Sequence, residues 1–155
     1  MYPSQHLIIG TIFAGILFWT FPEIPIAGFL LIIASTVLID VDHYIIYILI
    51  AKDWSLKNAY RWHSEAGKNF KKLSKEKKRE LRHCFYIFHG IEPMIIVYII
   101  ANIISPYFYF ILLGMALHMV LDIIFGAYHG YGLHKIFLMY DIGRFDESKM
   151  IHERN

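Results

Sequence analysis

Four apolar stretches, each long enough or nearly long enough to cross a lipid bilayer, dominate this sequence. They cover residues 6–21, 26–51, 84–104 and 107–127. A transmembrane helix needs roughly 20 mainly apolar residues, and the third and fourth stretches meet that length. The composition agrees, because 57% of the residues are hydrophobic and 18% are charged, against about 45–50% and about 25% in soluble domains. We therefore predict an all-α fold, a polytopic membrane helical bundle of about four transmembrane helices.

Short connections that contain proline join the stretches in pairs. Pro22 to Pro25 separates the first stretch from the second. Ser105-Pro106 ends the third, because proline disfavours a helical conformation in the residue before it. Connections this short make each pair an antiparallel hairpin. The first stretch is short for a full crossing, and the second is long enough to span the bilayer and continue along the interface. Pro93 is expected to kink the third stretch near its start.

The segment between the two hairpins, residues 52–83, carries most of the positive charge. From Lys52 to Arg82 it holds eleven basic and four acidic side chains, a net charge of +7. Loops rich in lysine and arginine stay in the cytoplasm, so we expect a multi-pass protein of the inner or plasma membrane with both termini cytoplasmic. Residues 1–155 then form one membrane domain with a cytoplasmic tail at 128–155. The charge also suits anionic lipid headgroups, and nucleic-acid binding is the weaker interpretation because topology already explains the charge.

Ionisable side chains lie inside the apolar stretches, and this topology places them in one layer. Every stretch contributes, and at a rise of about 1.5 Å per residue each contribution falls on the cytoplasmic side. An aspartate near the centre of a transmembrane helix costs about 2.5–3.5 kcal/mol on insertion scales, and such residues normally face the bundle interior and mark a functional site. The residues in this layer are His6, Asp40, Asp42, His43, His89, Glu92, His118 and Asp122.

Three of the predicted helices each carry a carboxylate and a histidine three or four residues apart, which places both on one helix face. Helical bundles build metal sites from such pairs. Histidine and carboxylate together suit zinc best, with manganese or iron as alternatives. A divalent cation would also neutralise carboxylates that are costly to bury. The predicted metal ligands are His6, Asp40, His43, His89, Glu92, His118 and Asp122.

Asp42 and the outer histidines need separate interpretation. On a regular helix Asp42 points about 200° away from Asp40, so it either holds a second metal where the helix is locally unwound or caps the cytoplasmic segment. Asp42 and Glu92 are the candidates for a catalytic general base if they are not metal ligands. His129 follows the fourth helix closely enough to reach the site. Three further histidines are interpreted as solvated: His63, His134 and His152.

Short motifs in this order point to a known family. The chain reads Ser4-Gln5-His6 followed by Gly10, then Asp40-Val41-Asp42-His43, and later His118 with Asp122. Over roughly residues 4–125 this resembles the membrane-bound metal-dependent hydrolases of the YdjM type, which combine Ser/Thr-x-His, Asp-x-Asp-His and His-x-x-x-Asp. Many members also carry His-Arg-Gly-x-x-His-Ser. Here the chain has His89-Gly90-Ile91-Glu92-Pro93 instead, which leaves the ligands of the third helix open.

The resemblance implies phosphoester hydrolysis at a multi-metal centre, because the family is thought to be related to zinc-dependent phospholipase C and single-strand nucleases. We therefore expect a membrane-embedded metallohydrolase in which the metal activates a water. The expected partners are membrane lipid and a phospholipid or another phosphorylated substrate at the cytoplasmic face. The alternative is a carrier of protons or divalent metal, although few polar residues lie in the outer halves of the helices. A haem-anchoring protein is a third interpretation, but it leaves the carboxylates unexplained.

Overall fold

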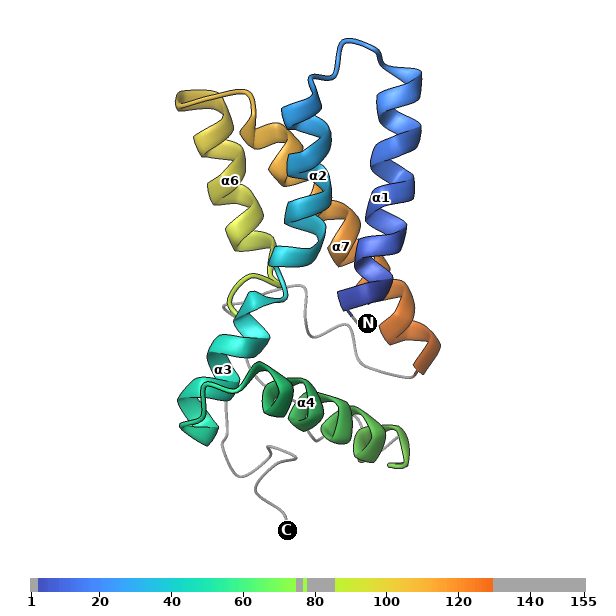
Figure 1. Cartoon of the computed structure of the whole chain (residues 1–155), viewed down its shortest axis with the longest axis vertical. Helices are drawn as coiled ribbons and strands as arrows, with labels where there is room; N and C mark the ends of the chain where they lie inside the picture. The colour runs from blue at the N-terminus through green and yellow to red at the C-terminus, as the bar shows by residue number, and fades with distance from the viewer. Residues whose placement is uncertain (1–2, 75–76, 78–85, 130–155) are drawn as a thin grey trace.

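The computed structural model describes residues 3–74, 77 and 86–129, and within them every regular element is a helix (Figure 1). This confirms the predicted all-α fold class. The cytoplasmic tail predicted from 128 onward is described only at 128 and 129, which belong to the last helix. The helices are α1 (Pro3–Thr20), α2 (Ile26–Leu38), α3 (Val41–Ala51), α4 (Leu56–Lys71), α6 (Ile91–Ile103) and α7 (Phe108–His129).

The proline-containing turns fall where the sequence places them. α1 begins with Pro3, a residue suited to the first helical turn because its missing N–H is not needed there. α1 ends at Thr20, and α2 begins directly after Pro25. The second turn contains Ser105 and Pro106 and connects α6 to α7. The pairs α1–α2 and α6–α7 are therefore antiparallel hairpins, as predicted (Figure 1).

The second apolar stretch bends instead of forming one regular helix. Ile39 and Asp40 form a turn between α2 and α3. There the backbone N–H of Asp40 donates to the carbonyl of Val37, and that of His43 donates to the carbonyl of Asp40, both at 3.1 Å. These bonds join residues three apart, as in a 3₁₀ turn, whereas an α-helix joins residues four apart. This is the local unwinding that allows both aspartates of the Asp-x-Asp motif to face one site.

The third apolar stretch forms a shorter helix than predicted. α6 begins at Ile91, so residues 86–90 are irregular chain and His89 lies before the helix. Pro93 causes no kink, because it occupies the first helical turn, where its missing N–H leaves no intrahelical bond unmade. The prediction of one helix over 84–104 with a kink at Pro93 was therefore wrong for the described residues before Ile91.

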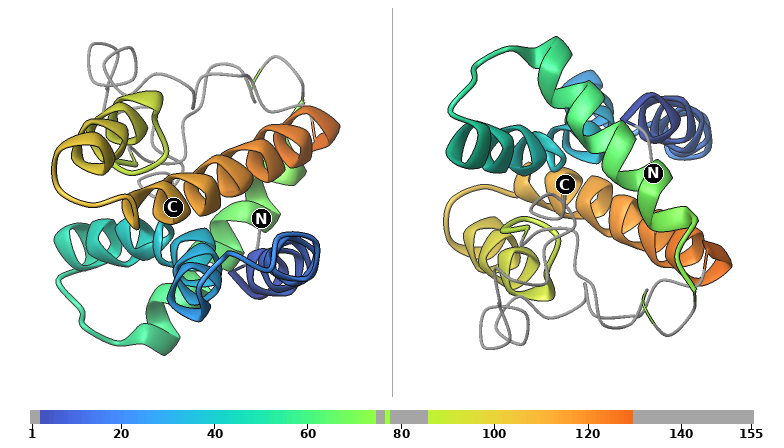
Figure 2. Two further views of the ribbon diagram at one scale, coloured as in Figure 1. Left: turned by 90° about the horizontal axis from the view of Figure 1, so that it is seen from above. Right: turned by 90° about the horizontal axis from the view of Figure 1, so that it is seen from below.

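α7 runs through the middle of the bundle and packs against α2, α6 and α1, and α2 also packs against α1 (Figure 2). α6 lies on the far side of α7 from α1. Gly114 on α7 allows close approach, because a Cβ there would lie 2.0 Å from Ser35 Oγ and 2.5 Å from the carbonyl oxygen of Ile32. A Cβ on Gly10 of α1 would lie 2.9 Å from Thr36 Cγ2. Small residues at helix crossings are typical of membrane bundles.

Two helical stretches are long and apolar enough to cross a membrane. They are residues 26–51, which include the turn at Asp40, and Phe108–His129, which is α7. Only 28% and 22% of their most apolar windows are buried inside the structure. α6 is apolar but shorter. Two of the four predicted transmembrane stretches, the second and the fourth, therefore have candidate spans in the described residues.

α4 is a helix within the segment predicted to be cytoplasmic and partly helical. Its first turn is capped by Ser55, whose Oγ accepts a hydrogen bond from the backbone N–H of Asn58 at 3.3 Å. Ala59, Ala66 and Phe70 form its buried side. α4 packs against α3 and crosses the end of the bundle that is nearest to α3 (Figures 1 and 2).

Candidate metal centre

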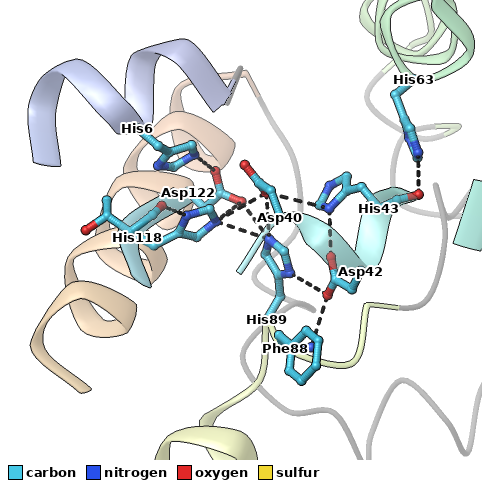
Figure 3. Close-up of polar contacts among 10 residues, drawn as sticks. His6, Asp40, Asp42, His43, His63, Phe88, His89, His118 and Asp122 are labelled. Carbon is cyan, nitrogen blue, oxygen red and sulfur yellow. Dashed lines mark hydrogen bonds and ion pairs between the residues drawn. The ribbon is translucent and has the colours of Figure 1, made fainter. Parts of the chain in front are cut away.

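Histidine and aspartate side chains from four segments meet at the end of the bundle where α2 turns into α3 (Figure 3). Two groups of them could hold a metal ion, because within each group the ligand atoms lie within 4.8 Å of one another. The side chains are largely or fully buried, apart from the half-buried His43. The structure thus brings six of the seven predicted ligands together. The groups are His6, His118 and Asp122, and Asp40, His43 and His89.

Three ligand atoms form a triangle at the boundary between the two groups. The Nε2 atoms of His89 and His118 lie 3.1 Å apart. Asp40 Oδ1 lies 3.3 Å from His89 Nε2 and 3.6 Å from His118 Nε2. Asp122 Oδ2 lies 3.9 Å from both Nε2 atoms, just outside this triangle. The irregular segment before α6, the α2–α3 turn and α7 each supply one corner (Figure 3).

The second ring nitrogen of each histidine in the triangle already donates a hydrogen bond. His118 Nδ1 lies 2.8 Å from the backbone carbonyl oxygen of Thr36, which can only accept. His89 Nδ1 lies 3.0 Å from Asp42 Oδ2, and a carboxylate also accepts. A neutral imidazole has one N–H, so both Nε2 atoms present lone pairs to each other and to Asp40 Oδ1. Three acceptors at these distances repel one another unless a cation or an added proton lies among them.

The spacing of these acceptors fits a tetrahedral metal ion. Zinc binds histidine nitrogen and carboxylate oxygen at about 2.0–2.2 Å, so two ligand atoms of one tetrahedral ion lie about 3.3–3.6 Å apart. The sides of the triangle are 3.1, 3.3 and 3.6 Å. Three protein ligands with a further open position are typical of catalytic zinc sites. Asp40, His89 and His118 therefore fit a zinc ion as a set.

His6 and Asp122 extend the centre towards α1. His6 Nε2 lies 3.3 Å from Asp122 Oδ1. The His6 ring stacks on His118 with centroids 3.8 Å apart. Neither nitrogen of the fully buried His6 ring has a hydrogen-bond partner within the described part of the chain, and neither has Asp40 Oδ2. Buried polar atoms without partners are rare in native proteins, and a metal ion bound here would give these atoms a partner.

Asp42 orients two histidines. Its Oδ1 accepts from His43 Nδ1 at 2.8 Å, and its Oδ2 accepts from His89 Nδ1 and from the backbone N–H of Phe88, both at 3.0 Å. Carboxylates commonly fix the orientation of ligating histidines in this way. Both oxygens are engaged and the side chain is fully buried, an arrangement that suits an orienting residue; the general-base role stays a prediction. The turn at Asp40 redirects Asp42, which on a regular helix would point away from the site.

Two candidates from the sequence lie outside both groups of possible metal ligands among the described residues. Glu92, predicted as a ligand and as an alternative base, occupies the first turn of α6. The two residues do not share one helix face as predicted, because His89 precedes the helix. His129, considered within reach of the site, donates from Nδ1 to the carbonyl of Phe125 on its own helix at 2.9 Å.

His63 is the residue next to the site that sequence reasoning missed. It was interpreted as solvated, but it is half-buried and its Nε2 donates to the backbone carbonyl of His43 at 2.9 Å (Figure 3). Its spacing from Ala59, Ala66 and Phe70 places it on the buried side of α4, which is the signal that could have identified it. His134 and His152 lie outside the described residues.

The chain was compared with protein-family models, curated proteins and solved structures. No protein-family model, curated protein or solved structure matches the chain. The described residues include two groups of histidines and aspartates that could hold a metal ion.

Proposed function

We propose that this chain is a membrane-embedded, metal-dependent hydrolase that acts on a phosphoester at the cytoplasmic face. The observation that carries the proposal is the triangle of Asp40 Oδ1, His89 Nε2 and His118 Nε2, with sides of 3.1 to 3.6 Å. Histidine and carboxylate ligands favour zinc, iron or manganese over calcium. Zinc is the proposed ion because two sides of the triangle fall within its tetrahedral spacing and the third, 3.1 Å, is about 0.2 Å shorter.

Exposed apolar side chains support a multi-pass topology. Ile8, Ile12 and Ile16 on α1 are 58–60% exposed, and Ile96 on α6 and Ile124 on α7 are exposed to a similar degree. Contiguous apolar surface of this kind marks contact with a membrane or an apolar partner. We propose crossings by α1, by α2 with α3, by α6 and by α7, with both chain ends and α4 in the cytoplasm. The excess of lysine and arginine between the hairpins favours this orientation.

The side chains of the centre divide into those that hold the ion and those that orient them. When bound, the metal supplies Lewis acidity and an activated water. Asp42 holds the His89 ring, and the Thr36 carbonyl holds the His118 ring, so that each Nε2 faces the centre. Asp40 Oδ2 is buried and has no hydrogen-bond partner in the described chain, so it can accept one from a substrate hydroxyl or a water. The residues proposed to hold the metal are Asp40, His89, His118 and Asp122.

We include His6 in the centre as a ligand of a second metal ion. The resemblance to YdjM-type hydrolases implies more than one metal. His6 Nε2 lies 3.3 Å from the Asp122 oxygen that faces away from the triangle, and the ring has no other polar partner among the described residues. Two metals about 3.5–4 Å apart stabilise the attacking and leaving oxygens of phosphoryl transfer. His6 and Asp122 are the ligands we propose for that second position.

A phosphoester substrate follows from the surroundings of the site. The centre lies at the end of the bundle crossed by α4, whose exposed side is rich in lysine and arginine. Positive potential near a site concentrates anionic substrates, and anionic headgroups lie at the cytoplasmic surface of a membrane. A phospholipid headgroup or a phosphorylated solute therefore suits both the location and the charge.

The test is hydrolysis of a panel of phospholipids and soluble phosphodiesters by the protein in nanodiscs with added zinc or manganese. We expect the wild type to release product, Asp40→Ala to lose this activity, and Glu23→Gln, an exposed carboxylate in the α1–α2 turn, to keep it. Release by neither the wild type nor Asp40→Ala, or equal release by both, would overturn the hydrolase proposal. Metal flux into proteoliposomes that is lost in Asp122→Ala would instead favour the carrier.

A further inference from the structure

α4 has a basic side whose residues are not among the candidate ligands of the metal centre. Its buried side is formed by Ala59, Ala66 and Phe70, which contact the rest of the protein. At 3.6 residues per turn, the opposite side carries basic residues at intervals that keep them in one stripe. We call this stripe the basic face, and all its members are exposed. They are Lys57, Arg61, Lys68 and Lys72.

Contacts at both ends of α4 fix which side of the helix faces the rest of the protein. Before its first turn, Asp53 accepts hydrogen bonds from the backbone N–H of Ser55 at 2.9 Å and from the hydroxyl of Tyr47. The bond from Tyr47 lowers the pKa of the Asp53 carboxyl, so it remains ionised in this network. At the other end, Lys71 Nζ lies 5.6 Å from the centre of the Phe125 ring on α7, a cation–π distance. The basic face is thus held in a fixed direction.

Apolar side chains border the basic face near the start of α4. Trp54, Leu56 and Tyr60 are 75%, 69% and 60% exposed. Leu56 and Tyr60 are four residues apart and share one side of the helix, between the buried side and the basic face. Tryptophan and tyrosine concentrate at membrane–water interfaces. An apolar edge beside a lysine- and arginine-rich side is typical of helices that lie in the plane of the interface.

We propose that the basic face of α4 binds the headgroups of anionic phospholipids at the cytoplasmic surface of the membrane that holds the bundle. Charge complementarity supports this partner, because the face has four cations and one exposed acid at its edge, Glu65. Each lysine or arginine near an anionic surface strengthens binding about five-fold. The proposal rests on the membrane part of the proposed function and is independent of metal binding and hydrolysis.

The experiment compares quenching of a fluorophore on α4 by two brominated lipids. The dye is attached to Leu56→Cys in a Cys84→Ser background of the full chain, in nanodiscs of mixed phosphatidylcholine and phosphatidylglycerol. The ratio of quenching by brominated phosphatidylglycerol to quenching by brominated phosphatidylcholine reports the lipid preference. We expect a ratio of about five or more at low salt, because even one basic side chain contributes that much. The ratio should fall as salt is added, because salt screens exposed charges.

Variants of the basic face test whether its charges cause the preference for phosphatidylglycerol. Lys57→Gln/Arg61→Gln/Lys68→Gln/Lys72→Gln, which removes all four charges of the basic face, should bring the ratio close to one. Lys57→Arg/Lys68→Arg, which keeps the charge, and Glu65→Gln should keep the ratio high. The salt dependence of the labelled parent protein tests the same point while the basic face keeps all its residues.

Several results would overturn the proposal. They are a ratio near one in the parent protein, an unchanged ratio in the variant that lacks all four charges of the basic face, or quenching by neither lipid. If the fluorescence of the dye changed on addition of double-stranded DNA but showed no lipid preference, the basic face would bind a soluble polyanion. That result would also overturn the proposal. Asp40→Ala should keep the lipid preference, so failure of the hydrolase proposal and failure of this one are distinguishable.

Discussion

The Nε2 atoms of His89 and His118 lie 3.1 Å apart, while the Nδ1 atom of each ring donates a hydrogen bond in the opposite direction. The two rings come from the irregular chain before α6 and from the middle of α7, so packing of this hairpin brings them together. Because Asp40 places a carboxylate oxygen against both nitrogens, the three acceptors repel one another unless a metal ion or an added proton lies between them. The predictions below follow from that arrangement and from the packing that produces it.

Asp42→Asn should weaken zinc binding without abolishing it. Asparagine keeps the shape of the side chain but cannot accept from both His43 and His89, so the His89 ring loses its fixed orientation. Loss of such an orienting carboxylate typically costs about 10–100-fold in metal affinity. Competition with a fluorescent zinc chelator measures this, with Glu23→Gln as the control. An unchanged affinity would remove the orienting role, and a loss as complete as that of Asp40→Ala would make Asp42 a ligand.

Glu92→Gln should leave the metal content unchanged, although the sequence places Glu92 among the ligands. The glutamate starts α6 and lies outside both groups of candidate ligands in the described chain. Asp122→Asn is the matched comparison, and it should lower the content because Asp122 lies 3.9 Å from both Nε2 atoms. Elemental analysis of the two purified variants checks the contrast. A drop in Glu92→Gln equal to that in Asp122→Asn would restore the original assignment.

The sequence predicts the helices and the layer of ionisable residues better than it predicts how those residues point. Apolar length and proline position identify the hairpins, because both act locally. The turn at Asp40 depends on tertiary contacts, which the sequence does not show. The spacing of a regular helix therefore predicted that Asp42 points away from the site. In the same way, Gly90 and Pro93 start α6 after His89, so His89 and Glu92 do not share the helix face that their spacing predicts.

Gly114→Ala should destabilise the bundle by about 1–3 kcal/mol, the usual cost of overpacking. The new Cβ would lie 2.5 Å from the backbone carbonyl oxygen of Ile32, which cannot move unless α2 moves. Gly15→Ala on α1 is the matched control, because a Cβ there meets nothing within 4 Å. It should be neutral or stabilising, since alanine favours helix over glycine by about 1 kcal/mol. Thermal unfolding in detergent compares them, and equal stability of the two variants would contradict the packing described here.

Cysteines at Lys72 and Glu23 should label from opposite sides of the membrane. Lys72 directly follows α4, which we place in the cytoplasm, and Glu23 lies in the exposed turn between α1 and α2. In a background that lacks Cys84, an impermeant thiol reagent added to intact cells should therefore label Glu23→Cys and spare Lys72→Cys. Labelling at Lys72 from outside would reverse the topology and move the site to the opposite face.

The amount of zinc per protein after purification without chelators tests the metal centre most directly. We expect near-stoichiometric or higher zinc in the wild type, because three buried acceptors converge at tetrahedral spacing. His118→Ala should lose most of it, whereas His129→Ala, a histidine on the same helix that bonds its own backbone, should keep it. A folded wild-type protein without bound transition metal, or equal metal in both variants, would contradict the account.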